Sequence, residues 1–289
     1  MHPRLRSLSV ISALAFVAAL CSAAPAQTDS QPEQFQRTFT VNSAATLAVE
    51  NYKGAIHVNG SDSNQVLVDV HKRFEGSDAD RKWWMENVKV SFRNDPGMVE
   101  IKVDYPSQTW NCTFCWRDHN FSDAVDLEIR VPRKINLKLD GYKPDIKISS
   151  VQGDVAIKSY KAPMLIESTT GAIHIDTYKD TMRLRDVTLQ GPLDVKSYKA
   201  DLEVSANALG STADLETDKG SIVLRVPEDS GLDVDYSGGR RSSFHSDFYL
   251  SASMGDGESV RGTINRGGTR VRLRTEKGSI SLEKLPRGL

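Results

Sequence analysis

Residues 142–184 read YKPDIKISSVQGDVAIKSYKAPMLIESTTGAIHIDTYKDTMRL, and this stretch decides the fold. A Tyr-Lys dipeptide opens it at Tyr142 and returns at Tyr160 and Tyr178, in steps of 18 residues. The positions four and six residues after each tyrosine are apolar, and the residue between them is usually polar. Apolar residues at every second position are typical of a β-strand that buries one face. The stretch therefore predicts short strands that recur at a fixed interval.

The same unit occurs seven times in the chain. The dipeptide also stands at Tyr52 and Tyr198, and its place is later taken by Asp218-Lys219 and Glu276-Lys277. The paired apolar positions of the seven copies are Ile56/Val58, Ile146/Ile148, Met164/Ile166, Met182/Leu184, Leu202/Val204, Ile222/Leu224 and Ile280/Leu282. Half-repeats follow Gly153, Gly171 and Gly191, with apolar pairs at Val155/Ile157, Ile173/Ile175 and Leu193/Val195. A strand thus recurs about every nine residues, and glycine marks the corners.

Two architectures fit this spacing. In a β-solenoid, rungs of about 18–20 residues stack along one axis. In an antiparallel β-sandwich or meander, hairpins follow at similar intervals. Equivalent Tyr-Lys turns in successive units favour the solenoid, although stacked lysines repel one another unless their heads are well solvated. We therefore expect an all-β fold, a β-solenoid-like repeat of short strands.

The stretch 74–123 interrupts the repeat. Ser77 and Asp80 resemble a helix capping box, which predicts one short helix over 78–87. Two strand-like runs follow at 88–92 and 99–103, and the residues 94–97 between them are a turn signal. We interpret 74–123 as an aromatic and cysteine-containing insertion that projects from a single β-strand-repeat domain spanning 38–289.

The composition excludes several classes of protein. The chain has 289 residues, of which 39% are hydrophobic and 26% charged, as in folded proteins. Lys and Arg number 37 against 38 Asp and Glu, so the formal net charge is -1 and no overall field attracts nucleic acid. We expect no nucleic-acid partner and, once the N-terminal segment is removed, no transmembrane segment.

The N-terminus has the pattern of a secretory signal peptide. A short basic segment and an apolar stretch precede the small residues at 24–26, so we expect 1–26 to be removed on export. A lipoprotein signal at Cys21 is disfavoured because Leu20 stands where a small residue is needed. The polar segment 27–37 is expected to be disordered. The mature protein is then periplasmic, on the outer surface or extracellular.

These residues carry a resemblance to a known family. The segments GAIHV at 54–58 and TEKGSISL at 275–282, the helix-like segment before Val88 and the ladder of Gly-x-hydrophobic-x-hydrophobic units resemble the bacterial putative-adhesin family of β-strand-repeat domains of unknown function. The resemblance covers roughly 41–285. It implies an exported all-β repeat domain with a role in adhesion or in the envelope, and it brings no catalytic residue. The cysteine-containing insertion departs from the family pattern.

Cys112 and Cys115 are the most reactive pair in the mature sequence. In an oxidising compartment a lone C-x-x-C pair usually closes a local disulfide, which is the structure we expect. A thiol oxidoreductase is an alternative, but such a pair usually starts a helix. A metal site would need two more ligands, for which His119 and His71 are the available side chains. We predict no metal and no cofactor.

Two groups of side chains are candidate binding surfaces. The aromatic residues of the insertion, which include every tryptophan of the chain, are Trp83, Trp84, Trp110, Phe114 and Trp116. They either bind a sugar or protein partner or form a small satellite core. The second group is the Tyr-Lys repeat at Tyr160, Lys161, Tyr178, Lys179, Tyr198 and Lys199. It either forms an aromatic and cationic stripe suited to an acidic polysaccharide or is repeat chemistry, in which the ring covers the turn.

No complete catalytic motif is present. Some β-solenoids cleave polysaccharides with a basic residue beside acids, and Lys158, Asp176, Asp194 and Lys196 would share one strand face here. Alternating charges on solvent-facing positions explain the same residues without catalysis. We therefore expect a non-enzymatic adhesin or cell-envelope interaction module that binds an unknown surface protein or polysaccharide. The alternative is a carbohydrate-active protein on the same scaffold.

Overall fold

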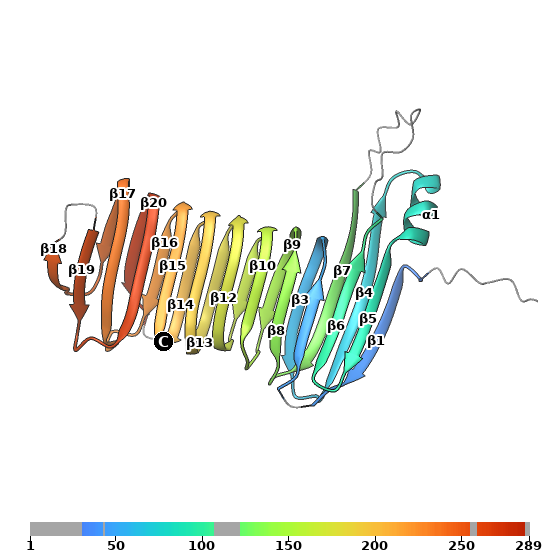
Figure 1. Cartoon of the computed structure of the whole chain (residues 1–289), viewed down its shortest axis with the longest axis horizontal. Coiled ribbons are helices and arrows are strands. Elements are labelled where there is room, and N and C mark those ends of the chain that lie inside the picture. The colour runs from blue at the N-terminus through green and yellow to red at the C-terminus, as the bar shows by residue number, and fades with distance from the viewer. Residues whose placement is uncertain (1–30, 43, 107–121, 255–258, 287–289) are drawn as a thin grey trace, which may run out of the picture.

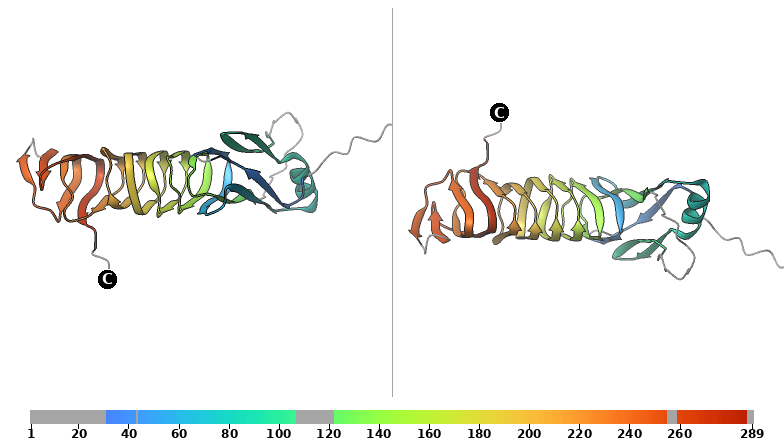
Figure 2. Two further views of the ribbon diagram at one scale, coloured as in Figure 1. Left: turned by 90° about the horizontal axis from the view of Figure 1, so that it is seen from below. Right: turned by 90° about the horizontal axis from the view of Figure 1, so that it is seen from above.

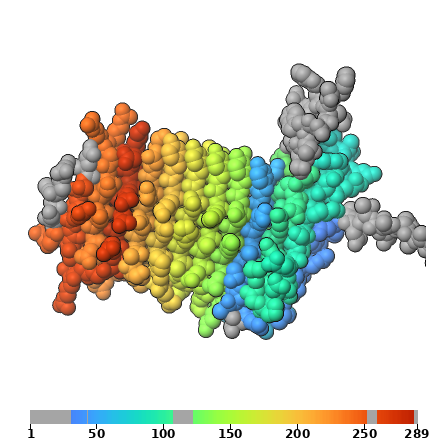
Figure 3. Space-filling model, in the orientation of Figure 1, coloured from blue at the N-terminus to red at the C-terminus, as the bar shows by residue number. Residues whose placement is uncertain are grey.

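The computed structural model describes residues 31–42, 44–106, 122–254 and 259–286. The signal peptide expected at 1–26 lies outside these ranges, and so does the segment with Cys112 and Cys115. The described chain forms an elongated stack of strands with a helix at its N-terminal end (Figure 1). The N-terminal residues, in blue, lie toward one end of the body, and the residues in orange lie toward the other (Figure 3). The C-terminal strand itself lies inside the stack. The fold is a β-solenoid, as the repeat predicts.

Two sheets face one another and are joined by corners, so that each rung contributes one strand to each sheet (Figure 2). From the N-terminal end, the first sheet contains β5 (Lys89–Asp95), β6 (Met98–Asp104), β2 (Thr46–Glu50), β8 (Asn136–Gly141), β10 (Val155–Lys161), β12 (Thr170–Lys179), the second part of β13 (Met182–Lys199), β15 (Thr212–Lys219), the first parts of β20 (Thr269–Lys284) and β17 (Leu232–Ser246), β19 (Ser259–Ile264) and β18 (Ser251–Met254). The second sheet contains β1 (Gln34–Thr40), β4 (Gln65–Glu75), β7 (Ser122–Pro132), β3 (Lys53–Ser61), β9 (Lys143–Ser149), β11 (Met164–Glu167), the first part of β13, β14 (Leu202–Ala208), β16 (Ile222–Val226) and the second parts of β20 and β17.

Neighbouring rungs are parallel and pair equivalent residues. Ile157 lies opposite Ile175, which in turn lies opposite Val195. A sandwich of hairpins would pair them antiparallel, so the alternative architecture does not apply to the repeat. The apolar positions of all seven copies are buried, with 0–3% of each residue exposed. Each such side chain contributes roughly 1.5–3 kcal/mol of transfer free energy, and the rungs share one core.

Corners between the rungs require glycine where two backbones meet. Gly171 has a φ of 146°, and a Cβ at this position would lie 2.2 Å from the carbonyl oxygen of Gly153 on the rung below. Neither the dihedral angle nor the space admits an L side chain. The corner glycines of the repeat therefore set how closely successive rungs stack.

The order of the rungs departs from the order of the chain at the C-terminal end. β20 pairs in parallel with β15 and β16 on one side and with β17 on the other. After β16 the chain forms β17 one rung farther out and then the antiparallel strands β18 and β19 (Figure 1). It then returns as β20, which lies between β16 and β17. Residues 238–246 belong to β17.

The N-terminal end differs from two expectations. The stretch 74–123 was expected to project, but within it β5 and β6 extend the first sheet. The flanking strands β4 and β7 extend the second sheet. Val66, Val68 and Val70 of β4 are buried. This strand therefore contributes to the core although it carries no Tyr-Lys dipeptide. The expected disorder of 27–37 is wrong for residues 34–37, which pair with β4 as part of β1.

Helix α1 (Asp78–Asn87) has the predicted bounds. The Ser77 hydroxyl accepts a hydrogen bond from the Asp80 amide at 3.2 Å, as the capping pattern indicated. The helix joins β4 of the second sheet to β5 of the first and buries Trp84 against Phe74, with the ring centroids 5.6 Å apart. It thereby covers this end of the core.

Candidate functional site

Five tyrosines stack along one edge of the solenoid. The rings of neighbouring members lie 4.8–5.0 Å apart, centroid to centroid, and within 4–17° of parallel. The members, in spatial order, are Tyr52, Tyr142, Tyr160, Tyr178 and Tyr198, and we call them the tyrosine ladder. The ring spacing equals the distance between adjacent strands, so parallel pairing of equivalent residues is enough to place the rings face to face.

Stacking determines what the ladder offers to a ligand. Each inner ring has both faces covered by its neighbours, so those faces are not available to stack on a sugar ring. At one end the Lys219 ammonium donates to the Tyr198 hydroxyl at 2.7 Å and lies 4.7 Å from the ring centroid. This hydrogen bond raises the pKa of Lys219. The accessible parts of the ladder are its ring edges and a line of hydroxyl groups.

A row of lysines runs beside the tyrosine ladder. Parallel pairing places each lysine next to its equivalent on the neighbouring rung. The row, which we call the lysine row, consists of Lys53, Lys143, Lys161, Lys179, Lys199, Lys219 and Lys277. The structure thus brings together the Tyr-Lys residues that the sequence singled out, on one edge.

Most of the lysine row has no acidic partner. Lys53 pairs with Asp123, and Lys219 binds the Tyr198 hydroxyl. For the remaining five lysines, no carboxylate of the described residues lies within ion-pair distance. Like charges on neighbouring strands repel, so this edge carries an uncompensated line of positive charge.

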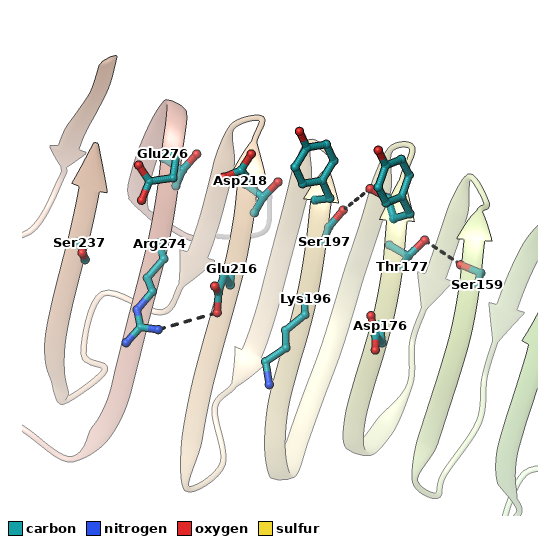
Figure 4. Close-up of a pocket in the computed structure, with 14 residues that line it drawn as sticks. Ser159, Asp176, Thr177, Lys196, Ser197, Glu216, Asp218, Ser237, Arg274 and Glu276 are labelled. Atoms are coloured by element: carbon teal, nitrogen blue, oxygen red, sulfur yellow. Dashed lines mark hydrogen bonds and ion pairs between the residues drawn. The ribbon is translucent and has the colours of Figure 1, made fainter. Parts of the chain in front are cut away.

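The tyrosine ladder ends where smaller acidic residues take its place. Asp218 and Glu276 occupy the next two rungs, at the upper ends of their strands in Figure 4. Beside them is a shallow hollow of about 570 Å³, which Lys196, Glu216 and Arg274 also line. The positive edge is therefore limited toward the C-terminal end by two carboxylates.

The charged residues considered for catalysis lie on the outer face of the first sheet. Asp176 is opposite Lys196, which is opposite Glu216, which is opposite Arg274. The last two form an ion pair at 3.8 Å, and Lys196 also lies 3.6 Å from Asp194. Opposite charges on adjacent strands stabilise their register. Sheet stability alone accounts for this arrangement.

The structure separates the two described tryptophans of the predicted aromatic surface. Trp83 is 45% exposed, whereas Trp84 is 1% exposed and its indole nitrogen donates to an Asp123 carboxylate oxygen at 2.7 Å. Trp84 thus belongs to the core. Trp110, Phe114 and Trp116, like Cys112 and Cys115, lie outside the described residues.

Tyr105 extends the aromatic line, which the sequence did not indicate. Its ring is 6.0 Å from that of Tyr52, and its hydroxyl donates to the Lys53 carbonyl at 2.7 Å. Burial raises the pKa of Tyr105. Tyr105, Trp83 and Asp123 border a hollow of about 460 Å³ at this end of the ladder. No repeat spacing marks Tyr105, so its place follows only from the pairing of β6 with β2.

Clusters of metal ligands and membrane-spanning helices are both absent from the described residues. They contain no group of three or more His, Cys, Asp or Glu that would hold a metal ion. His71, considered as a ligand, lies on β4. Among the described residues, no helix combines the length and the apolar character that crossing a bilayer requires.

Comparison with known proteins identifies the repeat. Residues 144–283 match the family model Toastrack DUF4097, which confirms the resemblance to a β-strand-repeat family of unknown function. A putative cell adhesion protein from Clostridium sporogenes is 8% identical, with a TM-score of 0.37 over 88% of this chain and 100% of that one. A putative adhesin from Bacteroides fragilis is 10% identical, with a TM-score of 0.47 over 89% and 99%. Likeness at this level carries no argument about ligands. No curated protein matches the sequence.

Proposed function

We propose that this chain, whose residues 144–283 match the Toastrack DUF4097 family model, is an exported, non-enzymatic interaction module of the cell envelope or cell surface, an adhesin in the broad sense. The tyrosine ladder and the lysine row form its binding surface. The observation that carries the proposal is the line of four lysines on successive rungs, Lys143, Lys161, Lys179 and Lys199, which have no carboxylate partner among the described residues and lie on an edge that the stacked core holds rigid.

Rigidity supports a role in binding. The lysines are attached to strand ends whose inward residues, such as Ile157 and Ile175, are buried. A partner that binds this edge therefore orders few backbone groups, and the cost in conformational entropy is small. Lysines without an ion pair, such as Lys161 and Lys199, are exposed, so their heads can adjust to a partner.

Export and the disulfide belong to the same proposal. Residues 1–26 act as a signal peptide, and the mature chain starts near Gln27 and folds as one domain. In an oxidising compartment Cys112 and Cys115 close a local disulfide. Intact mass of the exported protein is expected to match cleavage before Gln27 and the loss of two hydrogens. Free thiols, stoichiometric zinc or reduction of insulin by this chain would overturn the disulfide.

A carbohydrate-active protein is the second candidate. One observation favours it: Asp176, Lys196 and Glu216 border a single hollow on the first sheet, where acidic and basic groups are both close to solvent (Figure 4). Their regular pairing across the strands supports a structural role instead, so binding without cleavage stays the preferred function.

One screen separates the two candidates. The purified mature chain is incubated with acidic and neutral polysaccharides and with isolated cell-envelope material, and both retention and cleavage are measured. An interaction module binds reversibly and leaves the material intact. New reducing ends or unsaturated products would support the carbohydrate-active alternative and overturn the non-enzymatic function. Absence of binding to every material would contradict both candidates.

A further inference from the structure

We propose that the ligand of this edge is a linear polysaccharide with carboxylates along its length, a polyuronate, which lies parallel to the solenoid axis along the lysine row. The inference rests on the proposed function and specifies its ligand. It depends on three features of the edge: the geometry of the charges, the covered faces of the tyrosine rings, and the identity of the cations.

The geometry of the charges favours an extended polymer. Lys143, Lys161, Lys179 and Lys199 stand on four successive rungs, next to one another in register. Adjacent strands are about 4.8 Å apart, so the four lysines cover about 14 Å of a straight line. A small anion would meet one or two ammonium groups, whereas an extended chain meets all of them at once. Linked contacts of this kind add their free energies without a new ordering cost for each.

Among the described residues, the acidic side chains nearest the four lysines form no ion pair with them. Asp180 and Asp201 lie at the same corner, but the first accepts a hydrogen bond from the Thr181 amide at 3.1 Å and the second from the Ser221 amide at 2.8 Å. Beyond Tyr198, the carboxylates of Asp218 and Glu276 offset the charges of Lys219 and Lys277 on the same rungs, so an anion is attracted less there. The ligand is therefore confined to the rungs that carry tyrosine.

The tyrosine rings argue against a nucleic acid. Proteins that hold single-stranded nucleic acids stack bases on exposed aromatic faces. Here the faces of Tyr142, Tyr160 and Tyr178 are covered by neighbouring rings at 4.8–5.0 Å. What remains is a line of phenolic hydroxyls, each able to donate and accept a hydrogen bond, which matches the hydroxyl groups of a sugar chain.

The identity of the cations favours carboxylates over phosphates. Every unpaired cation beside the tyrosines is a lysine, a compact and strongly hydrated point charge. Arginine, whose planar fork binds phosphate in a bidentate manner, is absent from these rungs of the row. A single carboxylate on each sugar needs only one ammonium. The row therefore fits a uronate polymer better than a polyphosphate.

The test measures binding of fluorescently labelled polygalacturonate to the mature chain by anisotropy, at low and at physiological ionic strength. The variant Lys161→Gln/Lys179→Gln/Lys199→Gln removes three charges from the row. The control Lys82→Gln/Lys134→Gln/Lys138→Gln removes three exposed charges elsewhere, none of which pairs with a carboxylate of the described residues. Both variants are checked for the native unfolding midpoint, which the row variant keeps or exceeds because repulsion is reduced.

We expect the unmodified chain and the control to bind, with affinity that falls as salt rises. The row variant is expected to lose affinity by about tenfold or more, as three ammonium groups near a polyanion are removed. Equal binding by the row variant and the control would overturn the lysine row as the site. Equal affinity for galacturonate monomer would overturn the extended geometry, and equal affinity for polyphosphate would overturn the uronate class.

Failure of this inference is separable from failure of the proposed function. The same two variants are tested for reversible retention on cell-envelope material. One outcome is that the unmodified chain and the control are retained, the row variant is not retained, and polygalacturonate does not bind. In that case the proposed ligand class is wrong, but the lysine row is still the binding site. If the unmodified chain is not retained on any material, the proposed function itself is contradicted.

Discussion

The ring of Tyr178 lies 4.8 Å from the ring of Tyr160 and within 7° of parallel to it. The two residues are one repeat apart in sequence, and the strand pairing Ser159 to Thr177 and Lys161 to Lys179 brings them together. This contact ties the edge of the molecule to its core, because the rings stack only while the strands below them stay in register.

Loss of one inner ring is expected to destabilise the stack. Tyr178→Ala removes contacts with both Tyr160 and Tyr198, and each aromatic pair contributes about 0.5–1.5 kcal/mol. We therefore expect the free energy of unfolding to fall by about 1–3 kcal/mol in urea titrations. Tyr249→Ala is the control, since this tyrosine is 87% exposed, and it should change stability by less than about 0.5 kcal/mol. Equal effects of the two substitutions would show that the ladder contributes nothing.

A corner glycine is expected to be irreplaceable. Gly171→Ala places a Cβ 2.2 Å from the Gly153 carbonyl oxygen at a φ of 146°, and it should cost about 2 kcal/mol or more. Gly97→Ala meets no atom within 4 Å and should be nearly neutral. Thermal unfolding of the two variants gives the comparison. A Gly171→Ala protein as stable as Gly97→Ala would contradict the tight corner.

A buried lysine gives the fold a dependence on pH. Lys72 is 1% exposed on a core position of β4, and its ammonium donates to the Val88 carbonyl at 2.8 Å. Burial, with a smaller effect of Lys89, lowers the pKa of Lys72 from 10.5 to about 8. Between these pH values the unfolded chain binds a proton that the folded chain lacks, so stability rises with pH across this window.

The variant Lys72→Met tests this dependence. Relative to the variant, the unmodified chain should gain stability from about pH 8 to about pH 10.5, and the variant should be at least as stable at neutral pH. Urea unfolding at several pH values measures the difference. Parallel curves for the two proteins would mean that folding does not lower the pKa of Lys72.

An ion pair across three rungs is expected to add a small, salt-dependent contribution. Arg225 donates to Glu203 at 2.5 Å and to Glu283 at 2.8 Å, on the strands at either side. Both carboxylates are partly exposed, so Arg225→Gln should cost about 0.5–1 kcal/mol at low salt and less at high salt. Arg266→Gln is the control, because Arg266 is exposed and forms no ion pair with another described residue. A loss that salt does not reduce would contradict the ionic origin.

The repeat could be predicted because its signal is local. Alternation around residues such as Ile146 and Ile148 reports one buried face, and equal spacing of Tyr142, Tyr160 and Tyr178 implies equivalent positions in a stack. The helix at 78–87 was predicted for the same reason, since its cap and its turn lie within a few residues.

Long-range pairing could not be predicted from these patterns. β20 and β17 both carry alternating residues, and nothing in their sequences indicates that β20 is placed between β16 and β17. Likewise, β4 and β7 lack the Tyr-Lys marker, so their place in the second sheet depends on pairs such as Val68 with Ile129. Lys72 breaks the alternation rule because a lysine fills a core position.

The candidate edge was predicted in part. Its residues followed from the spacing, but two features depend on the corner geometry: the exposure of the ring edges, and the lack of a carboxylate partner, within the described parts of the chain, for the lysines from Lys143 to Lys199. The spacing also did not indicate that rings on successive rungs stack face to face. This distinction changes the ligand chemistry from ring stacking to charge and hydroxyl recognition.

The most direct measurement is the distance between spin labels placed on the lysine row, in a chain whose cysteines are replaced by serine. Labels replace Lys143 together with Lys199, Lys219 or Lys277, which lie three, four and five rungs away. With about 4.8 Å for each strand, the separations should rise in equal steps to about 24 Å, although Lys277 is 58 residues beyond Lys219. Separations that do not increase in this order would contradict a single straight row of lysines.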